Sequence, residues 1–333
     1  MKTKHAKSPC CHAQIYRFGH RRRQCSSCKR TWSIRPKKRG RPIVRIPPNV
    51  LTQAFLKKYT LLNLIQRRPG LGLSAFRYRF RQALRRFIAQ PSPQKIPSGP
   101  LILLADGLWF HFDQKPWILY LTALKPCSGK IAIFLDPILL PGKEGSFKWN
   151  RVFAAIPSEP RARIQALVVD NLNGMTTLAQ REGWILQLCH FHLILKLQIQ
   201  RGRERRVLKG GTVREEIYRT IRQALETPDE SHLNALLAQL THLAQTFCGT
   251  QRIQAMVREF IKTIKYYRAY RTHPELNLPN TTNTVEAMCS IIRDLLRRNR
   301  SASNPKALLQ WTTALIRLRQ ELTCNGKIIN RIY

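Results

Sequence analysis

The chain has 333 residues, with 58 Lys and Arg against 18 Asp and Glu, so its formal net charge is +40. A hydrophobic content of 43% is enough for one large core, or for two domains with small modules attached. No run of about 18 apolar residues is present and the first residues lack the apolar stretch of a signal peptide, so we expect neither a membrane span nor secretion.

The positive charge is concentrated at the start of the chain. The first 105 residues contain 25 Lys and Arg and no Asp or Glu. Each Lys or Arg that meets a phosphate releases condensed counterions, so a charge of this size indicates a polyanionic partner. We expect that partner to be double-stranded DNA rather than a membrane, and the location to be cytoplasmic and nucleoid-associated.

Residues 1–36 predict a small zinc-ribbon-like module. Its cysteines are Cys10, Cys11, Cys25 and Cys28. The last two have the Cys-x-x-Cys spacing that places two thiolates on one tetrahedral zinc, but position 8 is Ser where a regular first pair would have Cys. The other ligands must therefore come from Cys10, Cys11, His12 or His20. The alternative is a ribbon that has lost its metal. The clustering, in an odd total of nine cysteines, favours metal binding in a reducing compartment over disulfides.

Residues 37–45 form a basic arm. Its centre, Arg39-Gly40-Arg41-Pro42, resembles an AT-hook, in which Gly lets the backbone approach a narrow minor groove and Arg39 and Arg41 extend along it. The alternative is a plain basic linker. Both interpretations place the arm on DNA.

Residues 46–90 predict a helix-turn-helix. Helical periodicity covers Leu51–Gln66 and Leu73–Ile88, Pro69 and Gly70 stop the first helix, and Ser74 can cap the second. A basic helix after a short turn suits the major groove. Its basic residues are Arg77, Arg79, Arg81, Arg85 and Arg86. The alternative is a basic helical hairpin that contacts only phosphates.

A proline-rich linker, 91–100, precedes a predicted α/β core that begins at residue 101. Five apolar runs predict strands, over Leu101–Phe112, Trp117–Lys125, Lys130–Pro137, Ile164–Val169 and Trp184–Cys189. A short helix is predicted over Met175–Glu182, between the last two strands. Three consecutive strands followed by alternating helix and strand indicate a mixed sheet with helices on its faces. We expect this first part of the core to span 101–192, an all-helical insertion to span 193–272, final core helices to span 273–323 and end near Thr323, and a tail to cover 324–333.

Three of the scarce carboxylates stand at positions that suggest a site. Asp106 lies within the first apolar strand, where a charge is costly unless it binds something. Asp170 ends the fourth strand, and strand ends of open sheets form ligand sites. Glu286 begins a helix after a Thr/Asn-rich stretch. The alternatives are a turn at Asp106-Gly107, a helix cap at Asp170 and a capping box at Glu286. Asp136 also ends an apolar strand and is a weaker candidate.

From about Leu101 to Thr323 the chain resembles a DDE transposase of the Mutator-like group, which includes many bacterial insertion-sequence transposases. The resemblance lies in Asp106-Gly107, in Asp170, in the Cys-x-x-His of Cys189 and His192, and in Glu286 after a helical insertion. It implies a ribonuclease H-like core. The Cys189–His192 pair either takes part in the site or packs beneath it.

The resemblance implies two Mg²⁺ or Mn²⁺ ions at the three carboxylates. Asp106 would bridge them, with Asp170 and Glu286 each holding one. The ions would drive hydrolysis at a transposon end and then strand transfer into target DNA. Arg293 and Arg297 share the side of Glu286 on its helix and would contact the DNA backbone. Terminal inverted repeats and target DNA would be the partners, bound by a homodimer or higher oligomer because two ends are processed together.

Two other classes remain open at this stage. One is a non-catalytic DNA-binding regulator derived from a transposase, although such a protein would usually lose a carboxylate. The other is a nuclease or resolvase that cuts DNA on the same core without joining it.

Overall fold

The computed structural model describes residues 7–20, 22–33, 46–47, 49–66, 72–92, 95–201, 211–246, 251–299, 302–319 and 321–323. The chain divides into two compact units, Met1–Pro47 and Pro48–Tyr333. The predicted basic arm, with Arg39 and Arg41, and most of the turn between the predicted DNA-binding helices lie outside the described residues.

The first unit contains a small antiparallel sheet. Its strands are β1 (Ile15–Arg17), β2 (Arg22–Cys25) and β3 (Thr31–Ser33), in the order β1-β2-β3. Only Ser8 and Cys25 are fully buried among its described residues. Two small side chains bury too little apolar surface to stabilise a fold by themselves.

The second unit is built on a mixed sheet. Its strands are β4 (Leu101–Phe112), β5 (Lys115–Pro126), β6 (Ile131–Phe134), β7 (Ile138–Pro141), β8 (Ile164–Val169), β9 (Ile185–Leu188) and β10 (Glu321–Thr323). They follow the order β10-β6-β5-β4-β8-β9, and β7 also pairs with β5. The pair β4–β5 is antiparallel, whereas β8 and β9 run parallel to β4. The predicted mixed sheet is therefore confirmed.

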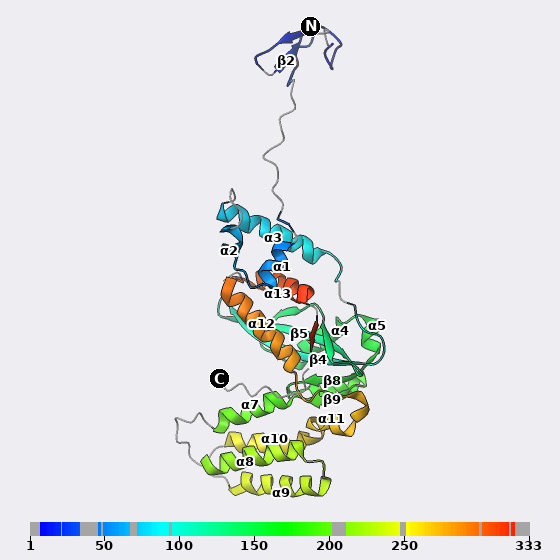
Figure 1. Ribbon diagram of the computed structural model, residues 1–333, viewed down its shortest axis with the longest axis vertical. Helices are drawn as coiled ribbons and strands as arrows, with labels where there is room; N and C mark the ends of the chain where they lie inside the picture. Colours follow the sequence, from blue (N-terminus) through cyan, green and yellow to red (C-terminus); the bar gives the residue numbers. More distant parts are fainter. Residues whose placement is uncertain are drawn as a thin grey trace. The chain divides into compact units, whose positions relative to one another are not determined.

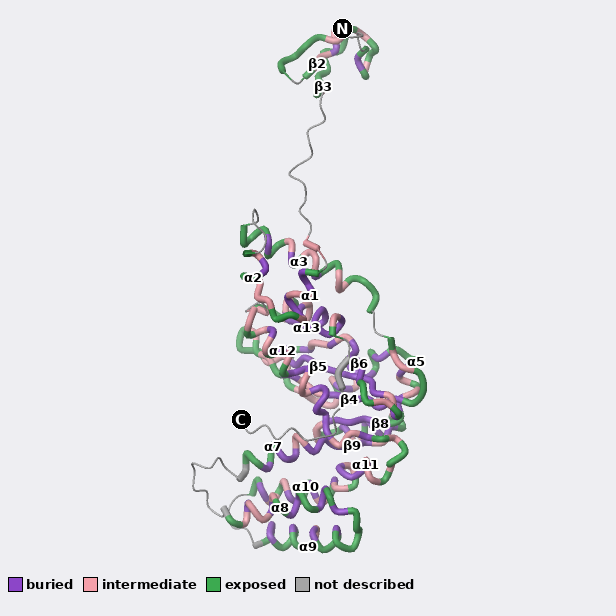
Figure 2. The backbone as a smooth tube through the Cα atoms, viewed as in Figure 1, coloured by how far each residue is buried: buried purple, intermediate pink, exposed green. Residues whose placement is uncertain are grey.

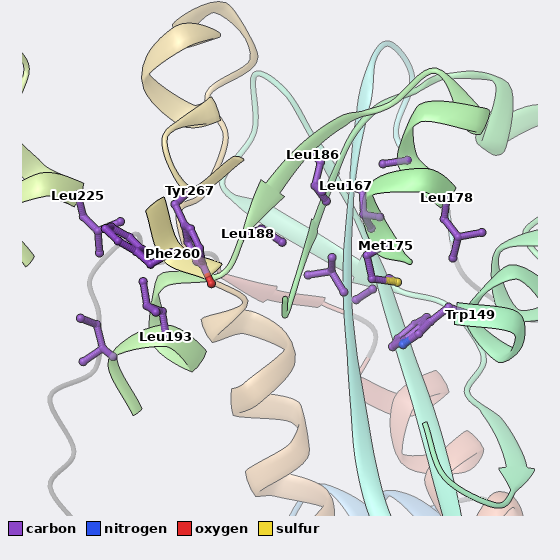
Figure 3. Packing of buried hydrophobic residues seen from close by; sticks show 14 of the residues in the cluster. Trp149, Leu167, Met175, Leu178, Leu186, Leu188, Leu193, Leu225, Phe260 and Tyr267 are labelled. Atoms are coloured by element: carbon purple, nitrogen blue, oxygen red, sulfur yellow. The ribbon is translucent and has the colours of Figure 1, made fainter. Parts of the chain in front are cut away.

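One face of the sheet carries a core of large side chains under three short helices, α4 (Ser146–Ala154), α5 (Ser158–Ala162) and α6 (Met175–Glu182). Leu103 and Ala105 of β4 belong to the same buried cluster as Trp149, Phe153 and Met175 (Figure 3). Because successive strand residues point to opposite faces, Asp106 points away from this cluster.

The opposite face is covered by α12 (Asn283–Asn299) and α13 (Pro305–Arg319), with α12 against β4 and β5. Helices α1 (Asn49–Phe55) and α3 (Leu73–Ala89) lie against α13, and α2 (Leu61–Gln66) packs on α1 and α3 (Figure 1). The rings of Phe55 and Phe80 both pack against Trp311 in tilted geometry, with centroids 5.1 and 5.5 Å away. The DNA-binding helices predicted from the sequence thus share an aromatic core with the last helix of the sheet domain.

The prediction of one helix over Leu51–Gln66 is wrong. The chain breaks at Lys58, whose φ of 59° lies in the left-handed region, and a new helix begins after Thr60. The backbone N–H of Thr60 donates to Asn63 Oδ1 and that of Asn63 to Thr60 Oγ1, so the two side chains cap α2. The predicted cap at Ser74 is also wrong. Helix α3 begins at Leu73, so Ser74 lies within the helix, and the N-cap residue is Gly72.

The chain between β9 and α12, which includes the predicted insertion over 193–272, is helical in its described residues. It comprises α7 (His190–Arg201), α8 (Gly211–Glu226), α9 (Glu230–Thr246), α10 (Gln251–Tyr267) and α11 (Ala269–Thr272), followed by a 3-10 turn, η1 (Pro274–Leu276). Its inward faces are buried, and the sheet's core cluster continues into them through Leu193, Leu225 and Phe260 (Figures 2 and 3). Within the described ranges, no helix combines the length and apolarity that crossing a bilayer requires.

The last helix is shorter than predicted. Instead of continuing to near Thr323, α13 ends at Arg319, and Glu321–Thr323 form β10 on the free edge of β6. Near this end Arg317 makes an ion pair with Asp136, which gives that candidate carboxylate a structural partner.

Candidate active site

Asp106 lies within β4, and Asp170 directly follows the neighbouring strand β8. Asp106 is paired with Leu121 of β5 on one side, while the pairing of β4 with β8 covers Leu101–Leu104 and ends before Asp106. Asp170 follows the last residue of β8. A strand whose neighbour has ended exposes its next side chains to a shared opening, so the two aspartates border the same end of β8.

Glu286 reaches the site from the first turn of α12. The carbonyl of Thr282 accepts hydrogen bonds from the N–H groups of Val285 and Glu286, at 2.8 and 3.0 Å. Thr282 is itself held by Cys189: its N–H donates to Cys189 Sγ at 3.3 Å, and its hydroxyl lies 3.2 Å from the same sulfur. Cys189, fully buried at the end of β9, therefore fixes where α12 begins.

His192 lies between Asp106 and Glu286. Its Nε2 is 2.9 Å from Glu286 Oε1 and 3.9 Å from Asp106 Oδ1. One ligand atom from each of the three residues lies within 4.8 Å of the others. Their side chains are only 11–22% exposed. Glu286, for which a capping box was the alternative to a site role, contacts His192.

Burial and mutual contact set the charges of this cluster. Burial and the neighbouring Glu286 hold the pKa of Asp106 well above its usual range. Burial opposes ionisation of Glu286, but hydrogen bonds from His192 and Asp106 leave its pKa lowered. Burial would lower the pKa of His192, yet its contacts with Cys189 and Glu286 raise it. Asp106 is therefore the harder of the two carboxyls to ionise, and the contact with Glu286 favours the protonated imidazole of His192.

Asp170 has a different cationic partner. Lys196 Nζ lies 3.0 Å from its Oδ1 and 3.1 Å from its Oδ2. Lys196 follows His192 by one helical turn on α7, so that helix presents one cation to the Asp106–Glu286 pair and another to Asp170. The structure brings Asp106, Glu286 and His192 into direct contact, and Asp170 is joined to them through α7.

The second histidine of the segment, His190, is structural. It is 3% exposed, and its Nε2 lies 2.7 Å from the carbonyl oxygen of Tyr267. Burial lowers its pKa to about 4, so it is neutral and its Nε2–H donates to that carbonyl. His190 therefore fastens the start of α7 to the end of α10.

The donor set fits hard divalent cations. Carboxylate oxygens are the ligands that Mg²⁺ and Mn²⁺ prefer. Asp106 and Glu286 are close enough to share an ion, and a divalent cation would relieve the repulsion between their negative charges. Asp170 could hold an ion once Lys196 is displaced.

The four predicted zinc ligands of the first unit also meet. One sulfur from each of Cys10, Cys11, Cys25 and Cys28 lies within 4.8 Å of the others. Ser8, at the position where a regular ribbon has Cys, makes a 3.3 Å hydrogen bond with Cys25 Sγ. That bond and the backbone at Cys28 lower the pKa of Cys25 to about 6, which favours the thiolate that zinc binds. Cys10 supplies the sulfur that Ser8 lacks.

Part of the predicted DNA-reading surface faces a hollow within the second unit. Arg77, Arg81 and Arg85 of α3 are exposed at helical spacing, and they line a hollow of about 660 Å³. Arg298 and Lys306, which the sequence analysis did not single out, line it from α12 and α13. Of the other predicted DNA contacts, Arg86, Arg293 and Arg297 are exposed and Arg79 is half-buried.

Two residues of the site were missed in the sequence. Lys196 could have been found from its spacing, one turn after His192 on a predicted helix. Glu144, between β7 and α4, contacts Gly107 and is described below. Its only signal in the sequence was the scarcity of acids, 18 in 333 residues.

No protein-family model and no curated protein sequence matches the chain. Among solved structures, it is similar to the Drosophila P element transposase strand transfer complex, with 9% identity, a TM-score of 0.37, and coverage of 82% of this chain and 91% of that one. It is also similar to the intasome of simian T-cell lymphotropic virus in complex with PP2A regulatory subunit B56 gamma. That match has 13% identity, a TM-score of 0.22, and coverage of 62% and 73%.

Proposed function

We propose that the chain is a DNA transposase of the DDE type, related to the Mutator-like insertion-sequence group, with a ribonuclease H-like core. The observation that carries this proposal is the meeting of Asp106 and Glu286 around His192, with Asp170 at the adjoining strand end. The strand order β6-β5-β4-β8-β9, with β5 antiparallel and β8 and β9 parallel to β4, supports the same core.

Each residue of the site would have a defined part in phosphodiester chemistry. Two divalent cations, when bound, would activate a water or a 3′ hydroxyl and stabilise the departing 3′ oxygen. Asp106 and Glu286 would hold one cation and Asp106 and Asp170 the other. Lys196 and His192 would keep the carboxylates charge-balanced until the cations arrive, and Cys189 would position Glu286 through Thr282.

The charge distribution supplies the DNA-binding part of the proposal. Basic side chains gather around one hollow of the second unit and would bind a phosphate backbone there. They are Arg77, Arg81, Arg85, Arg298 and Lys306. The first unit and the arm would add further contacts with the element ends. Processing of two ends together would require at least a dimer on DNA.

The test is Mg²⁺-dependent cleavage and strand joining on DNA that carries the terminal inverted repeats flanking the gene. We expect Asp106→Asn, Asp170→Asn and Glu286→Gln each to lower both activities by about 10³-fold or more, since each removes a cation ligand worth several kcal/mol. Asp113→Asn is the matched control. Asp113 is exposed in the tight turn between β4 and β5, with a φ of 49° that Asn also accepts.

The same assay separates the other classes. Cleavage without joining would indicate a nuclease. Specific binding with neither activity in the wild-type protein would indicate a regulator. Unchanged activity in the three variants would overturn the catalytic assignment.

A further inference from the structure

Glu144 lies in a short segment that is wedged against the chain next to both aspartates. The segment, residues 142–146, runs from the end of β7 to the first residue of α4. A Cβ atom added at Gly107, the neighbour of Asp106, would lie 2.8 Å from Glu144 Oε1. A Cβ added at Gly174, in the loop that follows Asp170, would lie 2.7 Å from Ser146 Oγ. Such distances are too short for a real Cβ, so glycine at both positions lets the segment reach the site.

The carboxylate of Glu144 is held in place from the hydrophobic core. Trp149 Nε1 donates to its Oε1 at 2.9 Å, and Trp149 is fully buried with its ring edge-on to Tyr120 at 4.7 Å. Trp109, on the same strand as Asp106, also acts to lower the pKa of Glu144. The indole of Trp149 orients the carboxylate without neutralising it, because an indole carries no charge.

Glu144 has no cation to balance it. Among the described residues of β4–β9, α12 and α13, the other partly buried acids each face a Lys, Arg or His. These acids are Asp106, Asp136, Asp170, Glu182, Glu286 and Asp294. Glu144 is also partly buried, but it forms no ion pair with a described basic residue, although the chain carries a net charge of +40. A desolvated carboxylate without a cation is costly, so its surroundings suit a cation that is not part of the chain.

The close approach of Ser146 to Gly174, in the loop after Asp170, places the segment of Glu144 on the Asp170 side of the site. Burial raises the pKa of Glu144 and the charge of Asp170 raises it further, whereas His192 lowers it, so both charges act on the group. Gly107 shares the sheet face of Ala105, whereas Asp106 points to the face of α12. Beside Glu144, the hydroxyl of Tyr120 is buried without a hydrogen-bond partner among the described residues, a further polar atom that would suit a ligand or its water.

We propose that Glu144 is a fourth carboxylate of the active site and binds, together with Asp170, one of the two divalent cations. This inference rests on the proposed function, since it places Glu144 at the same cation site. It assigns the 142–146 segment as a wall of that site, fixed by Trp149 on one side and by Gly107 and Gly174 on the other.

The test measures binding of Mn²⁺ alone to the full-length protein by calorimetry and by electron paramagnetic resonance. We expect the wild-type protein to bind two ions. Glu144→Gln, which has the same shape without the charge, should weaken one of them at least about tenfold, the loss expected for one carboxylate ligand. Glu144→Asp should fall between the two. The control Glu182→Gln removes a carboxylate of similar burial that is bound to Arg161, and it should bind Mn²⁺ like the wild type.

A second readout uses the two tryptophans. Tb³⁺ bound at Glu144 would luminesce on excitation of Trp149 and Trp109, and the signal should fall in Glu144→Gln and persist in Glu182→Gln. Circular dichroism establishes that each variant is folded, and if Glu144→Gln is not, Glu144→Asp decides in its place.

The outcomes separate this inference from the proposed function. Loss of Mn²⁺ in Asp106→Asn with wild-type binding and Tb³⁺ luminescence in Glu144→Gln would overturn the role of Glu144 and leave the proposed site standing. Absence of Mn²⁺ binding in the wild-type protein would overturn both.

Discussion

The imidazole of His192 and the carboxylate of Glu286 form an ion pair of 2.9 Å that joins the first turn of α7 to the first turn of α12. Asp106 lies on the other side of the same imidazole, at 3.9 Å. A protonated histidine between two buried carboxylates occupies the charge position that a divalent cation would take. His192 and the cation are therefore alternatives for the same negative charge.

His192→Asn tests this relationship. Removing the positive charge leaves Asp106 and Glu286 without a partner, so we expect the free energy of unfolding to fall by about 3 kcal/mol in the presence of EDTA. Mn²⁺ should restore most of it, because the ion replaces the lost charge. Thermal denaturation with and without Mn²⁺ measures both the loss of stability and its recovery. His232→Asn, on the exposed face of α9, is the control, and an equal loss of stability in EDTA and in Mn²⁺ would contradict the interpretation.

Removal of one sulfur from the cysteine cluster should release a zinc ion. We expect about one zinc per chain, bound by four sulfurs, and a metal content near zero in Cys28→Ser, because structural zinc requires four ligands. Cys10→Ser should have the same effect if Cys10 replaces the ligand that Ser8 cannot supply. Elemental analysis of the purified chain gives the stoichiometry. Cys127→Ser, in the second unit, should keep the metal, and full zinc content in Cys10→Ser would exclude Cys10 as a ligand.

The strands that border the site could be predicted because their periodicity is local. The apolar run over Leu101–Phe112 predicts β4 at its observed bounds, and Ile164–Val169 does the same for β8. Asp106 within the first and Asp170 after the second are thus placed by sequence. Their distances to Glu286 are set by the packing of α12 on the sheet, and no local pattern contains that packing.

The missed features depend on tertiary contacts. Strand β7 (Ile138–Pro141) is too short and too rich in proline and glycine at its ends to give a clear pattern, so Glu144 after it had no predicted context. The break between α1 and α2 at Lys58 lacks proline or glycine, and the packing of Phe55 against Trp311 stabilises it. Asp136 forms an ion pair with Arg317 of α13, which is distant in the sequence, so the local pattern around Asp136 could not reveal this partner.

Arg317 should be required for stability rather than for chemistry. It donates to both oxygens of Asp136 through Nε and Nη2, and through Nη1 to the carbonyls of Ile88 and Gln90 at 2.8 and 2.6 Å. We expect Arg317→Met to lower the free energy of unfolding by about 3 kcal/mol, since it leaves a partly buried carboxylate unpaired. Arg317→Lys should recover only part, because one ammonium cannot reach all four acceptors. Urea denaturation checks this. A decrease of less than about 0.5 kcal/mol in the free energy of unfolding of Arg317→Met would contradict this stabilising role of Arg317.

The hollow beside α3 should bind DNA phosphates. We expect Arg81→Ala and Lys306→Ala each to reduce the slope of log K against log salt concentration by about 0.9, as one phosphate contact contributes. The loss should be similar for unrelated DNA sequences, since phosphate contacts carry no base information. Fluorescence anisotropy at several salt concentrations measures it. Arg161→Ala is the control, because the guanidinium of Arg161 is bound by Glu182. An unchanged slope in both Arg81→Ala and Lys306→Ala would exclude the hollow as a phosphate-binding surface.

His190 should make the protein less stable in acid. Its pKa is about 4 in the folded chain against an ordinary value of 6.5, so the unfolded chain binds the extra proton between these limits. The stability from neutral His190 is present above pH 6.5 and is lost as the pH falls to about 4, a loss of roughly 3 kcal/mol. His190→Gln keeps an N–H for the carbonyl of Tyr267 but cannot titrate. Urea denaturation across this window should give a steeper decline for the wild-type protein than for His190→Gln, and parallel curves would show that His190 is not the group responsible.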